Sequence, residues 1–462
     1  MRRPVIVPTV PLTAPSGIQS TDVLSLNVLP APVPEVRLPN SVINIALLGG
    51  DSRHRGSGNT DVIIIASIYP DIPVVTLLSI PRDTLVYIPG HPMAKLNTAF
   101  RRGVEAFRQT MRYNFGLRID AYVLVNFTGL VRTVDLLGGI ELVATCPLHQ
   151  VFPRDPFYMA DPEQPNVVTR PYTDTFTGEV WEVGRAVPTM TISLPSPGVY
   201  KLNGLQALAY VRARYGVRGG DMDRGRRMQQ VLRAMLDKGR VNGLLSLTLI
   251  PQLFQQLDRY IETDLSLSQI LWLAQIANRL DESALRSRYF DAVGLTDITL
   301  PEVGAVLVPD RQRITPFLTQ ALTVSLNQSS EEGVAVEVWN GHAKPGFERV
   351  AVARMRELGL RVISVKQADR VYTETQVVDF TVTRKGSILP LLKRTIGVKD
   401  ANVRAEPKPD GPRYRIIVGN DFVSCYRDSY TFLKQSISLS SRAPITSPME
   451  QQEGTNKAPN AP

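Results

Sequence analysis

Three nearly uninterrupted apolar segments follow one another early in the chain, at residues 42–48, 61–68 and 74–80. They are rich in isoleucine and valine, and they lack the regular polar–apolar alternation of a half-exposed strand. Strands of this kind are typical of a sheet that is covered on both faces. We therefore expect these segments to be neighbouring central strands of one buried sheet.

Helical and strand patterns alternate after residue 100. Asn203, a favourable N-cap residue, opens a further helix. A Pro- and Thr-rich stretch at 147–200 predicts an insertion or long loop over the sheet. The predicted helices cover 101–114, 127–137, the segment from Asn203, 223–238 and more chain to about 280, and the added strands cover 121–127 and 140–144. This alternation predicts an α/β fold, a three-layer α/β/α domain over residues 41–325.

A second alternation predicts a small α/β domain over residues 332–427. We expect strands at 334–339, 360–365 and 413–418 and a helix at 346–358. A module of about a hundred residues is large enough to fold alone. Residues 1–40 are rich in proline, which predicts an extended linker. Residues 428–462 have the polar composition of a disordered tail.

The charge balance is basic, with 52 Lys and Arg against 43 Asp and Glu and a net charge of +9. This favours an anionic partner such as phosphate, a lipid head group or nucleic acid. We do not expect nucleic acid to be a partner, because the basic residues are not interleaved with aromatic ones and no nucleic-acid-binding motif is present.

The two cysteines, Cys146 and Cys425, stand far apart and without the spacing of a zinc site. Two free thiols are the expected state, and an inter-domain bridge is the less favoured alternative. No apolar stretch has the length of a signal peptide or of a membrane span, about 20 residues for the latter.

Two aspartates stand next to the predicted central strands. Asp51 follows the first strand and Asp61 opens the second, so antiparallel pairing would bring them together. Clustered carboxylates repel one another unless a cation neutralises them, and oxygen-only ligands suit Mg²⁺. The alternative is a loop aspartate that caps a turn and a strand-edge aspartate in water.

Arginines gather at predicted element ends. Arg82 closes the third strand, Arg212 and Arg214 flank a helix end, and Arg224 opens the next helix. A guanidinium group is a planar fork that binds phosphate oxygens bidentately, so several converging arginines would hold a diphosphate. The alternative is a solvated basic surface.

Together these segments closely resemble the LytR-CpsA-Psr family over about residues 42–240. Separate motifs stand in the family's order, among them Ser79-Ile80-Pro81-Arg82-Asp83 and Leu202-Asn203-Gly204-Leu205. The full series lies at residues 44–53, 60–61, 77–84, 95–100, 125–127, 134–140, 202–208 and 210–214. Residues 334–423 resemble the small C-terminal LytR-type domain that some members carry.

The resemblance implies a deep apolar pocket for a polyprenyl chain, with arginines gripping pyrophosphate at its mouth. Asp51 and Asp61 match the metal-binding aspartates, for Mg²⁺ or alternatively Mn²⁺. The matches to catalytic positions are Arg82, Asp221 and Arg224, and those to substrate-binding positions are Lys95, Arg212 and Arg214. Asp221 is a candidate base, and metal activation without a dedicated base is equally open.

The implied function is transfer of a phosphoglycan from a polyprenyl-pyrophosphate carrier to peptidoglycan or a related wall polymer. The resemblance also implies a place at the outer face of the cell membrane, in contact with the membrane surface. Two alternatives remain: a polyprenyl-pyrophosphate hydrolase, and a regulator that binds prenyl phosphate without catalysis.

The chain departs from the family pattern at three points. Asn59 stands where an arginine is usual, and Met228 replaces the first glutamine after the last arginine. Family members also usually begin with a membrane span, which is not visible in this sequence. We expect the two substitutions to affect rate and head-group choice rather than the type of reaction.

Overall fold

The computed structural model describes residues 29–50, 58–155, 157–158, 161, 163–213, 220–243, 249–280, 284–324, 334–381, 387–408 and 410–426, without the side chains of 220–222 and 291–292. The predicted tail at 428–462 and most of the predicted linker at 1–40 lie outside this part. Within it, no helix combines the length and the hydropathy needed to cross a bilayer.

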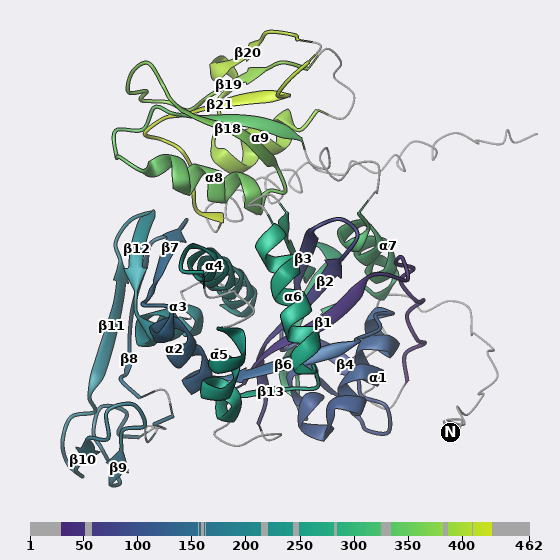
Figure 1. Cartoon of the computed structure of the whole chain (residues 1–462), viewed down its shortest axis with the longest axis vertical. Helices are drawn as coiled ribbons and strands as arrows, with labels where there is room; N and C mark the ends of the chain where they lie inside the picture. Colours follow the sequence, from purple (N-terminus) through teal and green to yellow (C-terminus); the bar gives the residue numbers. More distant parts are fainter. Residues whose placement is uncertain are drawn as a thin grey trace, which may run out of the picture.

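A mixed six-stranded sheet forms the centre of the larger unit, in the order β13-β6-β1-β2-β3-β14 (Figure 1). β1 is parallel to β6 and β3 is parallel to β14, while the other neighbours are antiparallel. The three predicted apolar segments are its central strands. The bounds are β1 Ile43–Gly50, β2 Thr60–Tyr69, β3 Val74–Ser79, β6 Ala121–Asn126, β13 Ile261–Thr263 and β14 Leu285–Tyr289.

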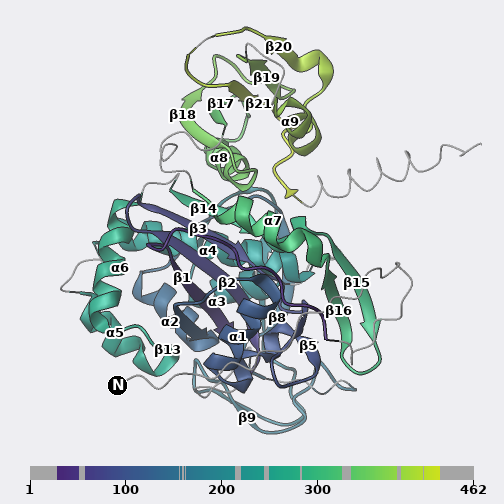
Figure 2. The same cartoon turned by 90° about the vertical axis from the view of Figure 1, so that its right-hand side faces the viewer.

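Helices cover both faces of this sheet, which confirms the three-layer prediction (Figures 1 and 2). Side chains of β2 alternate between two cores, Ile64 facing one and Ile63 and Ile65 the other. One face is covered by α2 Phe127–Leu136, α3 Gly204–Arg212, α4 Gly220–Val241 and α6 Leu267–Arg279, with α5 Ile250–Leu257 beside α2. The other is covered by α1 Val104–Phe115 and α7 Arg311–Leu322.

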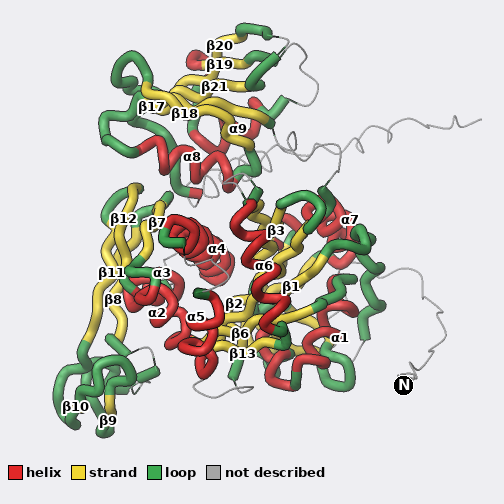
Figure 3. Tube along the Cα trace, viewed as in Figure 1, coloured by secondary structure: helices red, strands yellow, loops and turns green. Residues whose placement is uncertain are grey.

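Short two-stranded ladders occupy the stretch that we expected to be an insertion or loop over the sheet (Figure 3). A long loop was therefore the wrong expectation, because alternate residues such as Leu148, Ile192 and Leu194 are buried in the core beside α3. That the stretch is an insertion stays a prediction. β7 Ile140–Ala144 pairs with β12 Gly198–Leu202, β8 Leu148–Pro153 with β11 Thr189–Leu194, and β9 Tyr172–Thr173 with β10 Val180–Trp181. Two more ladders are β4 Leu85–Tyr87 with β5 Met93–Lys95 and β15 Leu295–Leu300 with β16 Gly304–Pro309.

A five-stranded sheet, in the order β18-β17-β21-β19-β20, has its own core with α8 and α9. The strands and the helix predicted for this region are present, and β19, β20 and α9 are additions to them. The bounds are β17 Ala335–Asn340, α8 Phe347–Glu357, β18 Arg361–Gln367, β19 Gln376–Asp379, α9 Leu389–Ile396, β20 Val403–Ala405 and β21 Tyr414–Val418. We call residues 334–426 the C-terminal unit.

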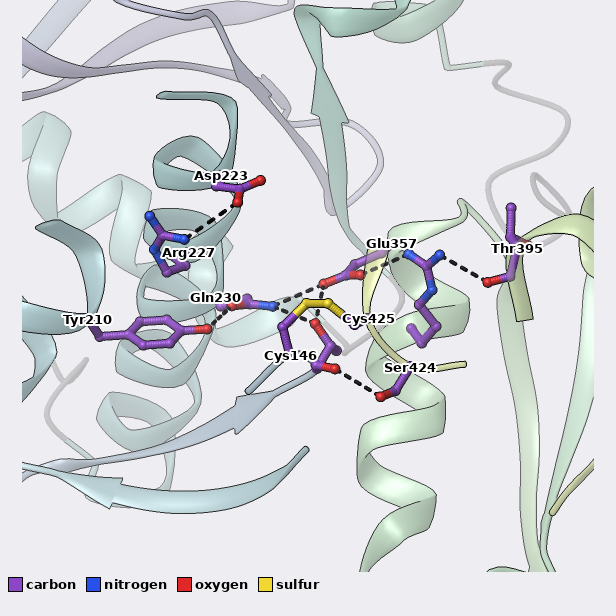
Figure 4. Close-up of a disulfide and its surroundings, with 11 residues drawn as sticks. Cys146, Tyr210, Asp223, Arg227, Gln230, Glu357, Thr395, Ser424 and Cys425 are labelled. Carbon is purple, nitrogen blue, oxygen red and sulfur yellow. Dashed lines mark hydrogen bonds and ion pairs between the residues drawn. A yellow bond between two sulfur atoms is a disulfide. The ribbon is translucent and has the colours of Figure 1, made fainter. Parts of the chain in front are cut away.

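A disulfide between Cys146 and Cys425 joins the C-terminal unit to the larger unit (Figure 4). The expectation of two free thiols was therefore wrong. The two Cα atoms lie 4.5 Å apart although 279 residues separate them in sequence. Their proximity depends on how the C-terminal unit docks, which local sequence patterns do not encode.

Residues 29–40 form neither helix nor strand, but they pack against the larger unit. Val33 and Val36 are buried, and their backbone N–H groups donate to the carbonyls of Tyr113 and Gly116. A Cβ atom on Gly116 would lie 2.1 Å from the carbonyl oxygen of Pro34, so glycine permits this approach. The last part of the predicted linker thus belongs to the packed unit, and the domain boundaries stay predictions.

Candidate functional site

The antiparallel register of β1 and β2 brings the end of one strand to the start of the other. Gly50 pairs with Thr60 across a bulge, which places Asp61 at this end of the sheet. The predicted juxtaposition of the two strand ends is confirmed at the level of the backbone. Asp51 follows Gly50 directly but lies outside the described residues.

Two arginines converge on the carboxylate of Asp61. Arg82 Nη1 forms an ion pair with Asp61 Oδ1, and Arg224 Nη1 lies 3.5 Å from the same oxygen. The Arg224 side chain is only 6% exposed, against 20% for Asp61. Two guanidinium groups thus meet at one carboxylate oxygen, an arrangement that also suits a phosphate oxygen.

Arg82 lies in the loop after β3, where Asp83 and the segment 95–97 hold it in place. The Asn97 N–H donates to the Arg82 carbonyl at 3.0 Å. Asp83 contacts Arg82 Nε at 3.5 Å and Lys95 Nζ at 3.1 Å. Lys95 therefore belongs to the same charged cluster through Asp83, while its predicted contact with a head group stays a prediction.

Arg224 is held in place by a close approach of α4 to β3. A Cβ atom on Gly225 would lie 2.9 Å from Ser79 Cβ, and the Ser79 hydroxyl donates to the Gly225 carbonyl. The buried Gln229 side chain donates to the Ser79 hydroxyl and to the carbonyls of Leu77 and Arg288. Sequence reasoning missed this role of Gln229; the glycine directly after Arg224 was the available signal. α4 also begins at Gly220, before the predicted 223.

Arg212 is the last residue of α3, and its guanidinium lies over the rings of Phe127 and Phe152 at 5.3 and 5.7 Å. Such stacking stabilises a cation and fixes its direction.

The predicted helix start is confirmed, since Asn203 forms a capping box with Gln206. The buried Arg227 donates to the carbonyl of Ala213 and so holds the chain that leaves α3. Arg214 and the side chain of Asp221 lie outside the described residues.

A small, mostly apolar hollow that is open to solvent lies beside this cluster. Asp61, Arg212 and Arg224 stand in its wall next to hydrophobic side chains. Its lining is Gly49, Asp61, Val62, Val125, Asn126, Phe127, Leu130, Leu208, Val211, Arg212, Arg224 and Met228. An apolar hollow with cations in its wall suits an amphiphile with an anionic head group.

Of the two residues that depart from the family pattern, Met228 lies in the wall of the cavity and Asn59 stands two positions before Asp61. Met228 lines the cavity and adds apolar surface to it. Asn59 Oδ1 is buried, and it has no hydrogen-bond partner in the described part of the chain.

The LytR_cpsA_psr family model matches residues 21–303 of this chain. Similar curated proteins include the polyisoprenyl-teichoic acid–peptidoglycan teichoic acid transferase TagU of Oceanobacillus iheyensis, 28% identical over 235 residues that cover 49% of this chain and 60% of TagU. Another is the probable cell wall biosynthesis protein LcpB of Corynebacterium glutamicum, 32% identical over 198 residues that cover 43% and 37%. The chain spans about half the length of the curated relatives that it matches.

Among solved structures, crystalline TagV of B. subtilis is 21% identical, with a TM-score of 0.44 over 62% of this chain and all of TagV. The family model covers more than half of the chain, and the residues that it spans include β1 to β14, Arg82, Arg212 and Arg224. The chain belongs to the LytR_cpsA_psr family.

Proposed function

We propose that this protein is a phosphotransferase that moves a phosphoglycan from a polyprenyl-pyrophosphate carrier to peptidoglycan or a related wall polymer. The observation that carries the proposal is the convergence of Arg82 and Arg224 on Asp61 in the wall of an apolar cavity. The names of relatives such as TagU support the same substrate class. Because the donor is a membrane lipid, the membrane surface is a further partner.

The cavity would bind part of the prenyl chain. Each methylene group that leaves water contributes about 0.8 kcal/mol. Arg82, Arg224 and Arg212 would bind the pyrophosphate, whose oxygens compete with Asp61 for the guanidinium groups. Asp61 thus keeps the two arginines close together before substrate binds, which lowers the cost of arranging them.

In the reaction, the oxygen of an acceptor hydroxyl forms a bond to the phosphorus atom that carries the glycan. The anhydride P–O bond breaks, and polyprenyl phosphate leaves with the electron pair. The hydroxyl proton passes to a base, for which Asp221 is the candidate. The arginines stabilise the negative charge on the transferred phosphoryl group and on the leaving phosphate.

Asp61 also has the chemistry of a magnesium ligand. In proteins Mg²⁺ is usually held by one or two carboxylates together with substrate phosphates, so Asp61, with Asp51 as the second candidate, fits this donor set. When bound, the ion would neutralise developing charge on phosphate oxygens. Within the described residues no group of three or more His, Cys, Asp or Glu side chains could hold a metal, so substrate oxygens would complete the site.

Removal of divalent cations should therefore abolish transfer. We expect turnover of a prenyl-pyrophosphate glycan to fall to background in EDTA and to return with excess Mg²⁺ or Mn²⁺. Zn²⁺ at the same concentration serves as the control for a nonspecific charge effect. Undiminished turnover in EDTA would show that no metal takes part.

Replacing Leu208 with tryptophan should block the lipid site. Leu208 lines the cavity and is only 3% exposed, so the larger ring would fill the hollow. Native mass spectrometry should detect prenyl phosphate bound to the purified, unchanged protein. The Leu208→Trp variant should carry at least ten-fold less of this lipid. Leu136→Trp, at a 42% exposed position on α2, is the matched control. Equal lipid in Leu208→Trp and the unchanged protein would contradict this use of the cavity.

A further inference from the structure

The C-terminal unit reaches the two helices that carry the site arginines (Figure 4). Tyr210 on α3 donates a hydrogen bond to Gln230 on α4. Gln230 Nε2 in turn donates to Glu357 Oε1 of the C-terminal unit at 2.9 Å. One short chain of side chains thus connects α3, which ends at Arg212, with α4, which carries Arg224, and with α8.

Glu357 is a buried anion at the centre of this contact. Its side chain is 8% exposed, and Arg354, which lies 3.4 Å away, is 3% exposed. Thr145, next to Cys146, lies 3.4 Å from the same carboxylate, and the Ser424 hydroxyl donates to the Thr145 carbonyl. A buried charge needs its ion-pair and hydrogen-bond partners, and removal of one of them is strongly destabilising. This contact therefore has one preferred geometry.

The disulfide fixes a second contact at the first turns of α4. Arg226 lies between the rings of Tyr289 and Tyr426, with its guanidinium carbon 3.8 and 4.9 Å from their centres. Tyr426 directly follows Cys425, so the covalent bond holds this ring near the helix. Burial, and next the nearby Asp223 carboxylate, raise the pKa of Tyr426, which keeps the phenol neutral. Arg226 is two residues from Arg224.

We propose that the C-terminal unit is a positioning module for the site: Glu357, through its contact with Gln230 on α4, and Tyr426, beside the Cys146–Cys425 bond, fix α3 and α4 so that Arg212 and Arg224 face the same ligand. The proposed helix positioning stands without the proposed function, whereas its consequence for pyrophosphate binding rests on that function.

The chain itself makes the test selective. It contains only two cysteines, so a reductant such as TCEP acts on this bond alone. Hydrogen exchange of the backbone amides in residues 204–213 and 220–232 should be compared in the oxidised, unsubstituted protein and in the reduced Glu357→Gln variant. We expect exchange in both segments to rise at least ten-fold in the reduced variant, with smaller increases for reduction or substitution alone. Unchanged exchange in the reduced variant would overturn the proposal.

Lys399→Ala is the matched control, because it removes an ion pair with Glu374 on the exposed surface of the same unit. Lys399→Ala should leave hydrogen exchange in α3 and α4 unchanged. If exchange rose as much as in reduced Glu357→Gln, any damage to the C-terminal unit would loosen the helices, and the proposal would be overturned. Affinity for farnesyl pyrophosphate should be measured on the same samples. A ten-fold loss of affinity for farnesyl pyrophosphate in the reduced variant would support the positioning of the arginines. Faster exchange in that variant, with no farnesyl pyrophosphate bound by any sample, would support the positioning of the helices but contradict the proposed function.

Discussion

Arg82→Ala should lower the turnover of a polyprenyl-pyrophosphate glycan by about 100–1000-fold, the usual effect of removing one preorganised donor from a charged transition state. Arg82 is one of two arginines that share Asp61, and it is 19% exposed, so it can reach both the carboxylate and a bound phosphate. The measurement is steady-state turnover with the carrier lipid at saturation.

Two further substitutions make the Arg82 result specific. Arg82→Lys keeps the charge but loses the planar fork, so we expect it to recover only part of the activity. Arg101→Ala removes an exposed arginine just before α1 and should leave turnover unchanged. Full activity in Arg82→Ala would remove Arg82 from the site, and an equal loss in Arg101→Ala would show that general charge, rather than this position, matters.

Gly204→Ala should lower the free energy of unfolding by about 2–3 kcal/mol, because it overpacks a contact between two helices. A Cβ atom at this position would lie 2.3 Å from the carbonyl oxygen of Val131 and 2.8 Å from its Cα. The Gly204 N–H also donates to Asp135, which ties the start of α3 to α2. Chemical denaturation of the variant and of the unsubstituted protein measures the change.

Ala209→Gly in the same helix provides the comparison for Gly204→Ala. It adds no atom and should cost only about 1 kcal/mol through lower helix propensity. If both substitutions cost the same, the close approach of α2 and α3 would not be what requires glycine at 204.

The central sheet was predictable because its strands consist almost entirely of apolar residues, as strands that are buried on both faces do. The run from Val62 to Ala66 has no polar residue, and the structure buries it on both faces of the sheet. The start of α3 was predictable for a local reason as well, since Asn203 caps the helix with its own side chain. By contrast, the strand β14 is short and pairs with β3 across about two hundred residues, so no local pattern identifies it.

The candidate site was predictable only as a list of residues. Arg82 and Arg224 stand out as arginines at element ends, but their meeting on Asp61 depends on the sheet register and on the packing of α4. Glu357 has no sequence signal of its own, because it acts through contacts made by the folded chain. The disulfide failed as a prediction for the same reason.

The most direct test of the proposed function is product analysis after incubation of the unsubstituted protein and Mg²⁺ with a radiolabelled polyprenyl-pyrophosphate glycan. One reaction contains purified peptidoglycan as acceptor and one does not. The predicted result is label joined to peptidoglycan with an equal amount of polyprenyl phosphate, and little turnover without acceptor. Equal release of free glycan phosphate in both reactions would instead identify a hydrolase, and bound but unchanged carrier in both would contradict catalysis altogether.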